Sequence, residues 1–270
     1  MPPCGFSGSL KKIEGVPPGI FSMPFFFPEM ISKLSWWVWL GGSILAWIAG
    51  MVNAIGFLGF QHQGVTHLTG TTTLLGVAVA EGDRSGMAHL AGIIAAFLAG
   101  AVIGGFIIQD GALKLGRRYG VALALESALL FAAVPLLTNH LLLGDYLASC
   151  ACGLQNGMVS TYSGAVLRTT HVTGTFTDLG IFIGQLFRGM AVDFRRIGLG
   201  LLLVFSFFGG GVAGAAGFAS FSYATLYFPA ALTGIVGLAY ALYVHFHRER
   251  KPPTAPNLPA TNLPAQVKQG

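Results

Sequence analysis

The chain has 270 residues, of which 53% are hydrophobic and only 9% charged, and its net charge is +5. Because a soluble domain carries about 25% charged residues, this composition excludes an ordinary soluble protein and indicates an integral membrane protein. Lys and Arg in the loops and tails of such a protein reflect its topology, so the positive charge predicts no nucleic-acid binding. The three cysteines, Cys4, Cys150 and Cys152, provide no disulfide framework.

The two ends of the chain differ from its middle. Residues 1–34 are rich in proline and lack an apolar core with a cleavage site, so we expect a cytoplasmic or interfacial leader rather than a signal peptide. Residues 248–270 are polar and proline-rich, which predicts a disordered cytoplasmic tail. Between them, residues 35–247 form one transmembrane domain.

Six apolar stretches of this domain are long enough to cross a hydrocarbon core, which takes about 20 helical residues. They span residues 36–60, 87–108, 121–137, 146–166, 197–221 and 224–244. Two further apolar helices, 70–80 and 174–186, are much shorter. At 1.5 Å per residue, the first of them covers about 16 Å, or half a membrane.

Each short helix belongs to a ten-residue phrase that the chain contains twice. HLTGTTTLLG spans residues 67–76, and HVTGTFTDLG spans residues 171–180. The match extends to flanking segments: 50–53 with 153–156, and 100–104 with 210–214. Because the matching segments follow the same order in both halves of the chain, they predict an internal duplication, with repeat 1 at about 36–138 and repeat 2 at about 145–247.

The charges of the loops decide how the short helices sit in the membrane. If both are re-entrant and the N-terminus is cytoplasmic, only Arg84 among the loop cations lies outside, and the others lie inside: Lys114, Arg117, Arg118, Arg168, Arg188, Arg195 and Arg196. Because positive loops stay inside, re-entrance is favoured. We therefore predict an all-α polytopic membrane protein built as a 3+3 inverted repeat, with six transmembrane helices, two re-entrant half-helices and both termini in the cytoplasm.

The repeated phrase also predicts a solute site. Thr69 and Thr173 are placed to cap the half-helices, and free N–H groups with a partial positive charge at such ends attract anions or polar solutes. We expect the two starts to meet near mid-membrane. The candidate substrate-binding residues are Asn53, His67, Thr69, Gly70, Thr71, Thr72, Asn156, His171, Thr173, Gly174, Thr175 and Thr177. The threonines and glycines could instead serve only capping and close packing, and the histidines only loop carbonyls.

Two acids are candidates for proton coupling. Glu126 lies inside an apolar helix without a counterpart in repeat 2, and ionisable residues at such depth are functional more often than not. Asp178 is expected in the first turn of the second half-helix, where the helix dipole alone would also stabilise a carboxylate. The matching position in repeat 1 is Leu74.

The pairing of an A-G-x-x-N-A helix (residues 49–54) with two Thr-Gly phrases resembles the YoaK-type family of uncharacterised bacterial transmembrane proteins. The resemblance covers about residues 35–244, and T-G-T-x-T-D-L-G at 173–180 is its most specific part. The chain departs from the common pattern at Thr71, where many relatives carry Asn, and at Asn53, where many carry Asp. The resemblance implies the bacterial inner membrane, but no substrate.

Together these features predict a transporter or channel for a small anion or polar solute bound at mid-membrane, with proton coupling as an option. The expected partners are the bilayer and the solute; a homo-oligomer is compatible with the pattern, and we expect no enzyme activity, cofactor or metal. One alternative is a membrane-embedded enzyme that uses His67, His171 and Asp178, although no H-E-x-x-H or G-x-S-x-G motif occurs. Another is a scaffold or sensor that transports nothing.

Overall fold

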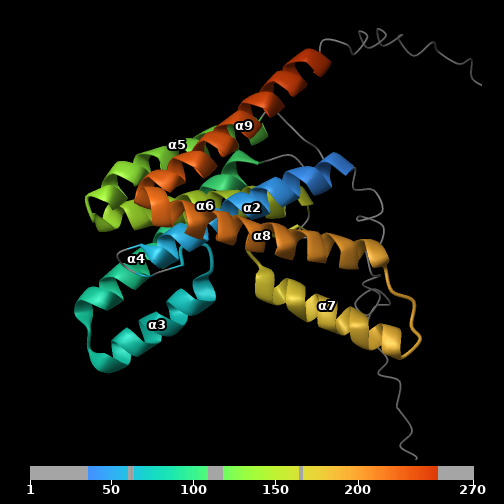
Figure 1. Cartoon of the computed structure of the whole chain (residues 1–270), viewed down its shortest axis with the longest axis horizontal. Helices are drawn as coiled ribbons and strands as arrows, with labels where there is room; N and C mark the ends of the chain where they lie inside the picture. Colours follow the sequence, from blue (N-terminus) through green and yellow to red (C-terminus); the bar gives the residue numbers. More distant parts are fainter. Residues whose placement is uncertain (1–35, 60–61, 63, 109–117, 164–166, 249–270) are drawn as a thin grey trace, which may run out of the picture.

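The computed structural model describes residues 36–59, 62, 64–108, 118–163 and 167–248. The predictions for the leader 1–34, for nearly all of the tail 248–270, and for Lys114 and Arg117 lie outside these residues. Within them the chain folds into eight α-helices and one 3-10 helix, and no strand occurs in these ranges (Figure 1).

The helices are α2 (Trp36–Leu58), α3 (Leu68–Glu81), α4 (Arg84–Ile107), α5 (Arg118–Thr138), α6 (Leu142–Ser163), α7 (Val172–Phe187), α8 (Phe194–Phe221), η1 (Ser222–Leu226) and α9 (Tyr227–Arg248). A helix occupies each of the eight predicted apolar stretches, with its ends shifted by four residues at most. The helical prediction is therefore confirmed.

Four helical stretches of the described chain are long and apolar enough to cross a membrane: Trp36–Leu58, Arg84–Ile107, Arg118–Thr138 and Phe194–Phe246. The last of them contains α8, η1 and most of α9. These stretches support a membrane protein. Although α6 has 22 residues, it is not among the four. It carries polar residues along its length, and most of them are buried inside the bundle.

Glycine contacts between α4 and α6 show that these two helices run in the same direction. A Cβ on Gly100 would overlap the carbonyl of Cys150, and a Cβ on Gly104 would come 2.7 Å from the carbonyl oxygen of Leu154. Small residues let helix backbones approach closely in this way.

The helices α2 and α8 repeat this crossing at matching positions. A Cβ on Gly210 would overlap the carbonyl of Trp47, and one on Gly214 would come 2.7 Å from that of Met51. The predicted duplication pairs Gly100 with Gly210 and Cys150 with Trp47, so the two crossings lie at matching positions. Both pairs of helices run parallel.

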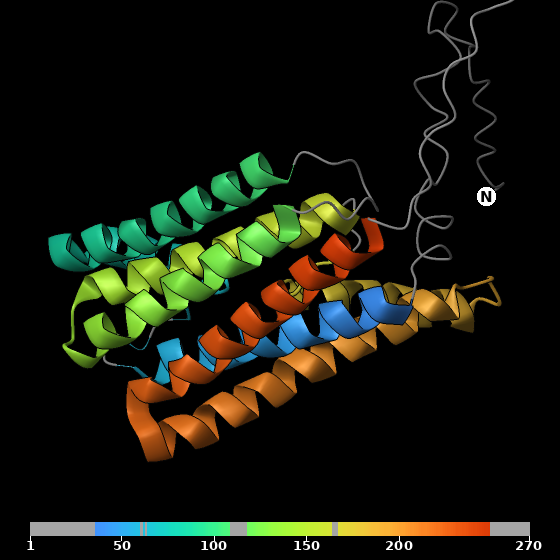
Figure 2. The same ribbon diagram turned by 90° about the horizontal axis from the view of Figure 1, so that it is seen from above.

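The remaining long helices run against their neighbours. Gly120 of α5 lies near Ala241 of α9, whereas Ser127 donates a hydrogen bond to the carbonyl of Ala230, so α5 and α9 are antiparallel. The α5 and α6 helices form a hairpin in which Gly144 packs on Leu137. The α8–η1–α9 segment is a second hairpin, so α2, α5 and α8 run one way and α4, α6 and α9 the other. Figure 2 shows these six helices side by side, with α4 (teal) and α8 (orange) at opposite edges.

The two short helices lie outside the six-helix bundle. After a turn with Gly82 at φ 72°, α4 doubles back along α3. After a turn with Gly189 at φ 69°, α8 doubles back along α7. In Figure 1 both short helices begin near the centre of the view and diverge toward opposite sides. The two short helices do not contact each other. The structure therefore shows no direct contact of the kind expected if their starts met.

Candidate functional site

The chain that leads into each short helix runs back along the long helix that precedes it. Thr66 donates its backbone N–H to the side-chain oxygen of Asn53 at 3.3 Å, five residues before α2 ends. Thr170 donates its hydroxyl to the side-chain oxygen of Asn156 at 2.9 Å, seven residues before α6 ends. At 1.5 Å per residue, the two segments return by about 8 and about 10 Å along α2 and α6.

The two segments also bond to the same helix, α6. The Ser149 hydroxyl donates to the carbonyl of Ile93 at 3.0 Å and also lies 3.5 Å from the carbonyl of Val65. Gln155 donates its amide to the Thr169 hydroxyl at 3.0 Å. These two α6 residues are six positions apart, or about 9 Å along the axis. We call the residues that lead into the short helices, 64–67 and 167–171, the entry segments. Because α3 and α7 do not contact each other, α6 is the element that joins the two entry segments.

The predicted threonine caps are wrong. The short helices begin at Leu68 and Val172, so His67 and His171 occupy the N-cap positions, and neither makes a side-chain capping bond. Thr69 and Thr173 are the second residues of their helices. The helices start two residues earlier than predicted because Leu68 and Val172 already adopt helical geometry, and a residue inside the helix cannot cap it.

Most threonines of the two phrases bond within their own helix. Each donates its hydroxyl to the carbonyl four residues earlier: Thr71 to His67, Thr73 to Thr69, Thr175 to His171, and Thr177 to Thr173. This use of the hydroxyl is common for threonine inside a helix. It leaves these hydroxyls as acceptors only. Thr69, Thr72 and Thr173 are exposed, and their hydroxyls form no hydrogen bond among the described residues, so these hydroxyls remain available as donors.

The glycines of the phrases make room for the histidine rings. A Cβ on Gly70 would come 3.1 Å from Cε1 of His67, and a Cβ on Gly174 would overlap the ring of His171. The His67 ring also lies against Gly64, where a Cβ would come 2.5 Å from its Nε2. The spacing His-x-x-Gly is therefore explained by a ring that lies over the first turn.

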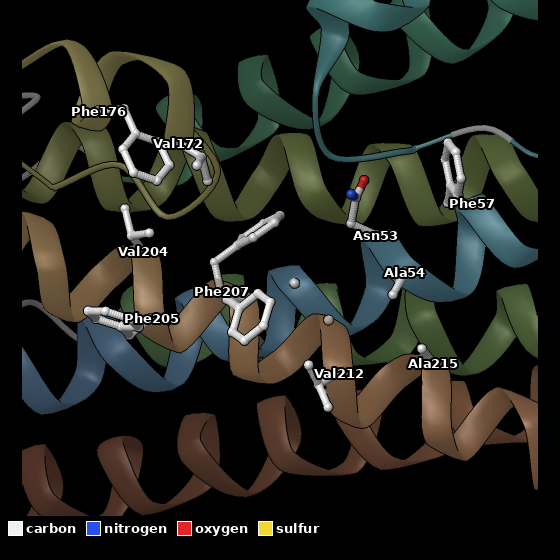
Figure 3. Close-up of a pocket in the computed structure, with 13 residues that line it drawn as sticks. Asn53, Ala54, Phe57, Val172, Phe176, Val204, Phe205, Phe207, Val212 and Ala215 are labelled. Atoms are coloured by element: carbon white, nitrogen blue, oxygen red, sulfur yellow. The ribbon is translucent and has the colours of Figure 1, made fainter.

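A groove of about 680 Å³ brings together residues of both predicted repeats (Figure 3). Asn53 of α2 lines it beside Val172 and Phe176 of α7 and Phe207 of α8. Asn53 is the only polar residue that lines this groove, and no threonine of either ten-residue phrase lines it. Its oxygen accepts the bond from Thr66, whereas its amide nitrogen has no partner in the described part of the chain.

The two predicted acids have opposite surroundings. Glu126 of α5 is 1% exposed, and its Oε2 atom has no hydrogen-bond partner among the described residues. Asp178 is exposed and is the seventh residue of α7, because that helix begins at Val172. The expected first-turn position of Asp178 is therefore wrong, and stabilisation by the helix dipole falls off beyond the first turn.

Three polar residues at one end of the bundle were missed by sequence reasoning. Asp145 of α6 is 4% exposed, and its Oδ2 atom has no partner among the described residues. His89 of α4 lies with Nδ1 3.4 Å from the hydroxyl of Tyr146. A signal for Asp145 was present, since Asp145, Ser149, Cys152 and Asn156 recur at intervals of four, three and four on one face of α6.

Comparison with known proteins identifies a family but no described relative. No curated protein and no solved structure matches the chain. The family model described as "Protein of unknown function (DUF1275)" matches residues 41–239, which include all eight helices at least in part. The chain therefore belongs to the DUF1275 family, in agreement with the resemblance to a family of uncharacterised membrane proteins that its sequence showed.

Proposed function

We propose that this protein is a bacterial inner-membrane transporter or channel for a small anion or polar solute, built as a 3+3 inverted repeat with two re-entrant half-helices. The observation that carries the proposal is the matched pair of side-chain bonds, Asn53 with Thr66 and Asn156 with Thr170. Both bonds hold non-helical backbone against a long helix inside the bundle. Such backbone is tolerated at membrane depth where it is buried in protein or lines a polar path.

The directions of the long helices support the inverted symmetry. The duplication pairs α2 with α6, α4 with α8 and α5 with α9, and the members of each pair run in opposite directions. Two units with three crossings each are then related as one unit turned upside down. This is the arrangement in which transporters place a solute between discontinuous helices.

The distribution of charge supports the orientation. The helix ends on one side of the bundle include Arg118, Arg195 and Arg196, whereas Arg84 lies at the opposite ends. The positive-inside rule then puts the N-terminus of α2 and the C-terminus of α9 in the cytoplasm. The partners of the protein in this proposal are the bilayer and the solute, with no nucleic acid, and a homo-oligomer is compatible with it.

The solute in this proposal is held by the starts of the half-helices. The first N–H groups of α3 and α7 have no intrahelical acceptor. The Asn53 amide and the hydroxyls of Thr69, Thr72 and Thr173 add further donors. These groups hold a small anion or polar solute without enzyme chemistry, cofactor or metal.

The test is flux through liposomes that contain the purified full-length protein, with chloride, sulfate, acetate and glycine as labelled probes. We expect at least one probe to move, and Thr173→Val to reduce that flux about tenfold or more. The matched control is Thr161→Val, because Thr161 is a helical threonine that only donates to the carbonyl of Gly157. Flux that is unchanged in Thr173→Val would count against the site, and the absence of flux for every probe would count against transport of this solute class.

A further inference from the structure

The groove between α2, α7 and α8 has the size and the lining of a small-molecule site (Figure 3). Its volume of about 680 Å³ lies within the range of about 300–1,000 Å³ that such sites have. Phenylalanine side chains from all three helices line it, among them Phe57, Phe176 and Phe207, and Asn53 is the only polar residue among its described lining. The groove therefore suits a solute with an apolar body and one polar end.

The polar group of the groove is the Asn53 carboxamide. Because a backbone N–H only donates, the Asn53 atom that faces the N–H of Thr66 at 3.3 Å is the oxygen. The amide nitrogen has no partner in the described part of the chain, and in Figure 3 it is turned toward the side on which Val172 and Phe207 lie. An amide nitrogen is a donor, so the partner that it lacks is an acceptor, such as a carbonyl or carboxylate oxygen.

A second polar group, the ring of His67, lies beside Asn53 over Gly64. A Cβ on Gly64 would come 2.5 Å from Nε2 of His67 and 2.9 Å from Oδ1 of Asn53. Both side chains therefore border one small space, which the glycine leaves open. The His67 ring forms no hydrogen bond among the described residues, so its Nε2 atom can donate to a ligand in one neutral tautomer and in the charged form.

The equivalent asparagine of repeat 2 has no such free group. Asn156 accepts the Thr170 hydroxyl at 2.9 Å through its oxygen and donates its amide to the carbonyl of Cys152 at 3.1 Å. Its oxygen and its nitrogen both have partners inside the protein. Of the two matching asparagines, only Asn53 has a nitrogen without a partner, so the groove provides one site rather than a symmetric pair.

The chemistry of the groove separates the classes of solute. An ammonium group only donates, so it cannot pair with the Asn53 nitrogen. Chloride and sulfate have no apolar body to pack against the phenylalanine side chains, and a hydrocarbon has no acceptor. A carboxylate has two acceptor oxygens, and hydrogen bonds to an ionised acceptor are stronger than neutral ones. None of the described lining residues carries a charge that would oppose it.

We propose that the solute of this protein is a monocarboxylate with an apolar body. Its carboxylate binds the Asn53 amide nitrogen and Nε2 of His67, and its body lies in the groove between α2, α7 and α8. This inference rests on the proposed transport function and names its substrate class. It also assigns a role to Gly64, whose missing side chain leaves room for the carboxylate between the two donors.

The experiment uses 4-benzoylbenzoate, a photoreactive carboxylate with an aromatic body, on the purified full-length protein in lipid nanodiscs. We expect cross-links within residues 172–176 and 204–215, located by mass spectrometry. Hexanoate should suppress them, whereas acetate and 1-hexanol at the same concentration should not. Suppression by 1-hexanol equal to that by hexanoate would overturn the proposal, because acyl chains of the bilayer would then explain the occupancy of the groove.

The length of the competing chain gives a quantitative test. Each methylene group that enters the groove should favour binding about fourfold, so the concentration that halves the labelling should fall by about that factor per methylene from butyrate to hexanoate. A concentration that is independent of chain length would overturn the proposal.

Asn53→Asp tests the polar end without removing the bond to Thr66, because a carboxylate oxygen still accepts that N–H. The variant loses the donor and gains a like charge. The concentration of 4-benzoylbenzoate for half-maximal labelling should rise at least tenfold, while hydrogen exchange of residues 64–67 stays at the wild-type rate. The matched control is Asn139→Asp, since Asn139 is exposed at the end of α5 and does not line the groove. Unchanged labelling of Asn53→Asp would overturn the proposal.

The outcomes also separate this inference from the proposed function. Flux of chloride, sulfate, acetate or glycine through liposomes, with labelling that hexanoate does not suppress, would overturn the inference and leave transport standing. Labelling that follows chain length and needs the Asn53 amide, without flux of hexanoate or of any other probe, would support the carboxylate site and count against transport.

Discussion

The hydroxyl of Thr170 donates a hydrogen bond to the side-chain oxygen of Asn156 at 2.9 Å. The equivalent bond in the first repeat is made differently, because Thr66 uses its backbone N–H to reach Asn53 at 3.3 Å. The Oγ1 atom of Thr66 is buried and has no partner among the described residues. Two positions that match in sequence therefore hold their segments through different donors.

This difference predicts unequal effects of one substitution. Thr170→Val removes the donor to Asn156, and we expect a loss of about 1 kcal/mol in local stability. Amide hydrogen exchange of the segment that leads into α7 should become faster. Thr66→Val keeps the backbone donor and removes an unpaired buried hydroxyl, so exchange ahead of α3 should stay the same or become slower. Equal acceleration in both variants would contradict the assignment of the two donors.

The helix crossings predict which glycines tolerate a methyl group. A Cβ on Gly100 or Gly210 would overlap a backbone carbonyl of the facing helix, which cannot move independently. Overpacking of this kind costs about 1–3 kcal/mol, so Gly100→Ala and Gly210→Ala should both lower the midpoint of thermal unfolding in detergent.

The matched control for the crossings is Gly105→Ala on α4. A Cβ there meets nothing within 4 Å. Since alanine favours a helix over glycine by about 1 kcal/mol, this variant should be neutral or slightly more stable. If Gly105→Ala lowered the midpoint of thermal unfolding as much as Gly100→Ala does, glycine would be needed for something other than close packing.

The sequence was sufficient to predict the helices but not to predict which helices contact each other. Apolar length predicted all eight, because a membrane segment must satisfy its backbone internally and a helix does so. The sequence matches the segments of Gly100 and Gly210, but it does not predict that each glycine lies at a crossing between helices of different predicted repeats. Which helices contact each other depends on three-dimensional packing, and the spacing of residues along one helix does not predict it.

The predicted site residues differ in what the structure shows of them. The sequence predicts Asn53 and Asn156 as solute-binding residues, and in the structure both side-chain oxygens accept hydrogen bonds from the entry segments. The threonine caps failed because a helix start shifts by two residues without any change in the apolar pattern. Asp145 was missed because it stands at the expected end of a span, where an acid normally reaches water, whereas here it is buried.

The ring of His171 predicts a specific rescue. A Cβ on Gly174 would overlap this ring, so Gly174→Ala should destabilise the start of α7 and reduce any flux. In the double variant with His171→Ala the overlap is gone, and the stability of the segment should return. The effects of the two substitutions should therefore be strongly non-additive, as expected for residues in contact. Additive losses measured by hydrogen exchange would show that the ring is not what limits the position.

The turns after the two short helices provide a direct test of the inverted repeat. Ser85, after the α3–α4 turn, and Ala191, between α7 and α8, are both exposed. In a background without the native cysteines, a membrane-impermeant maleimide should label Ser85→Cys on intact cells and Ala191→Cys only after permeabilisation. The reason is that α4 and α8 run in opposite directions and start at opposite ends of the bundle. Labelling of both sites from the same side would exclude the inverted arrangement, because equivalent turns of two parallel repeats share one face of the membrane.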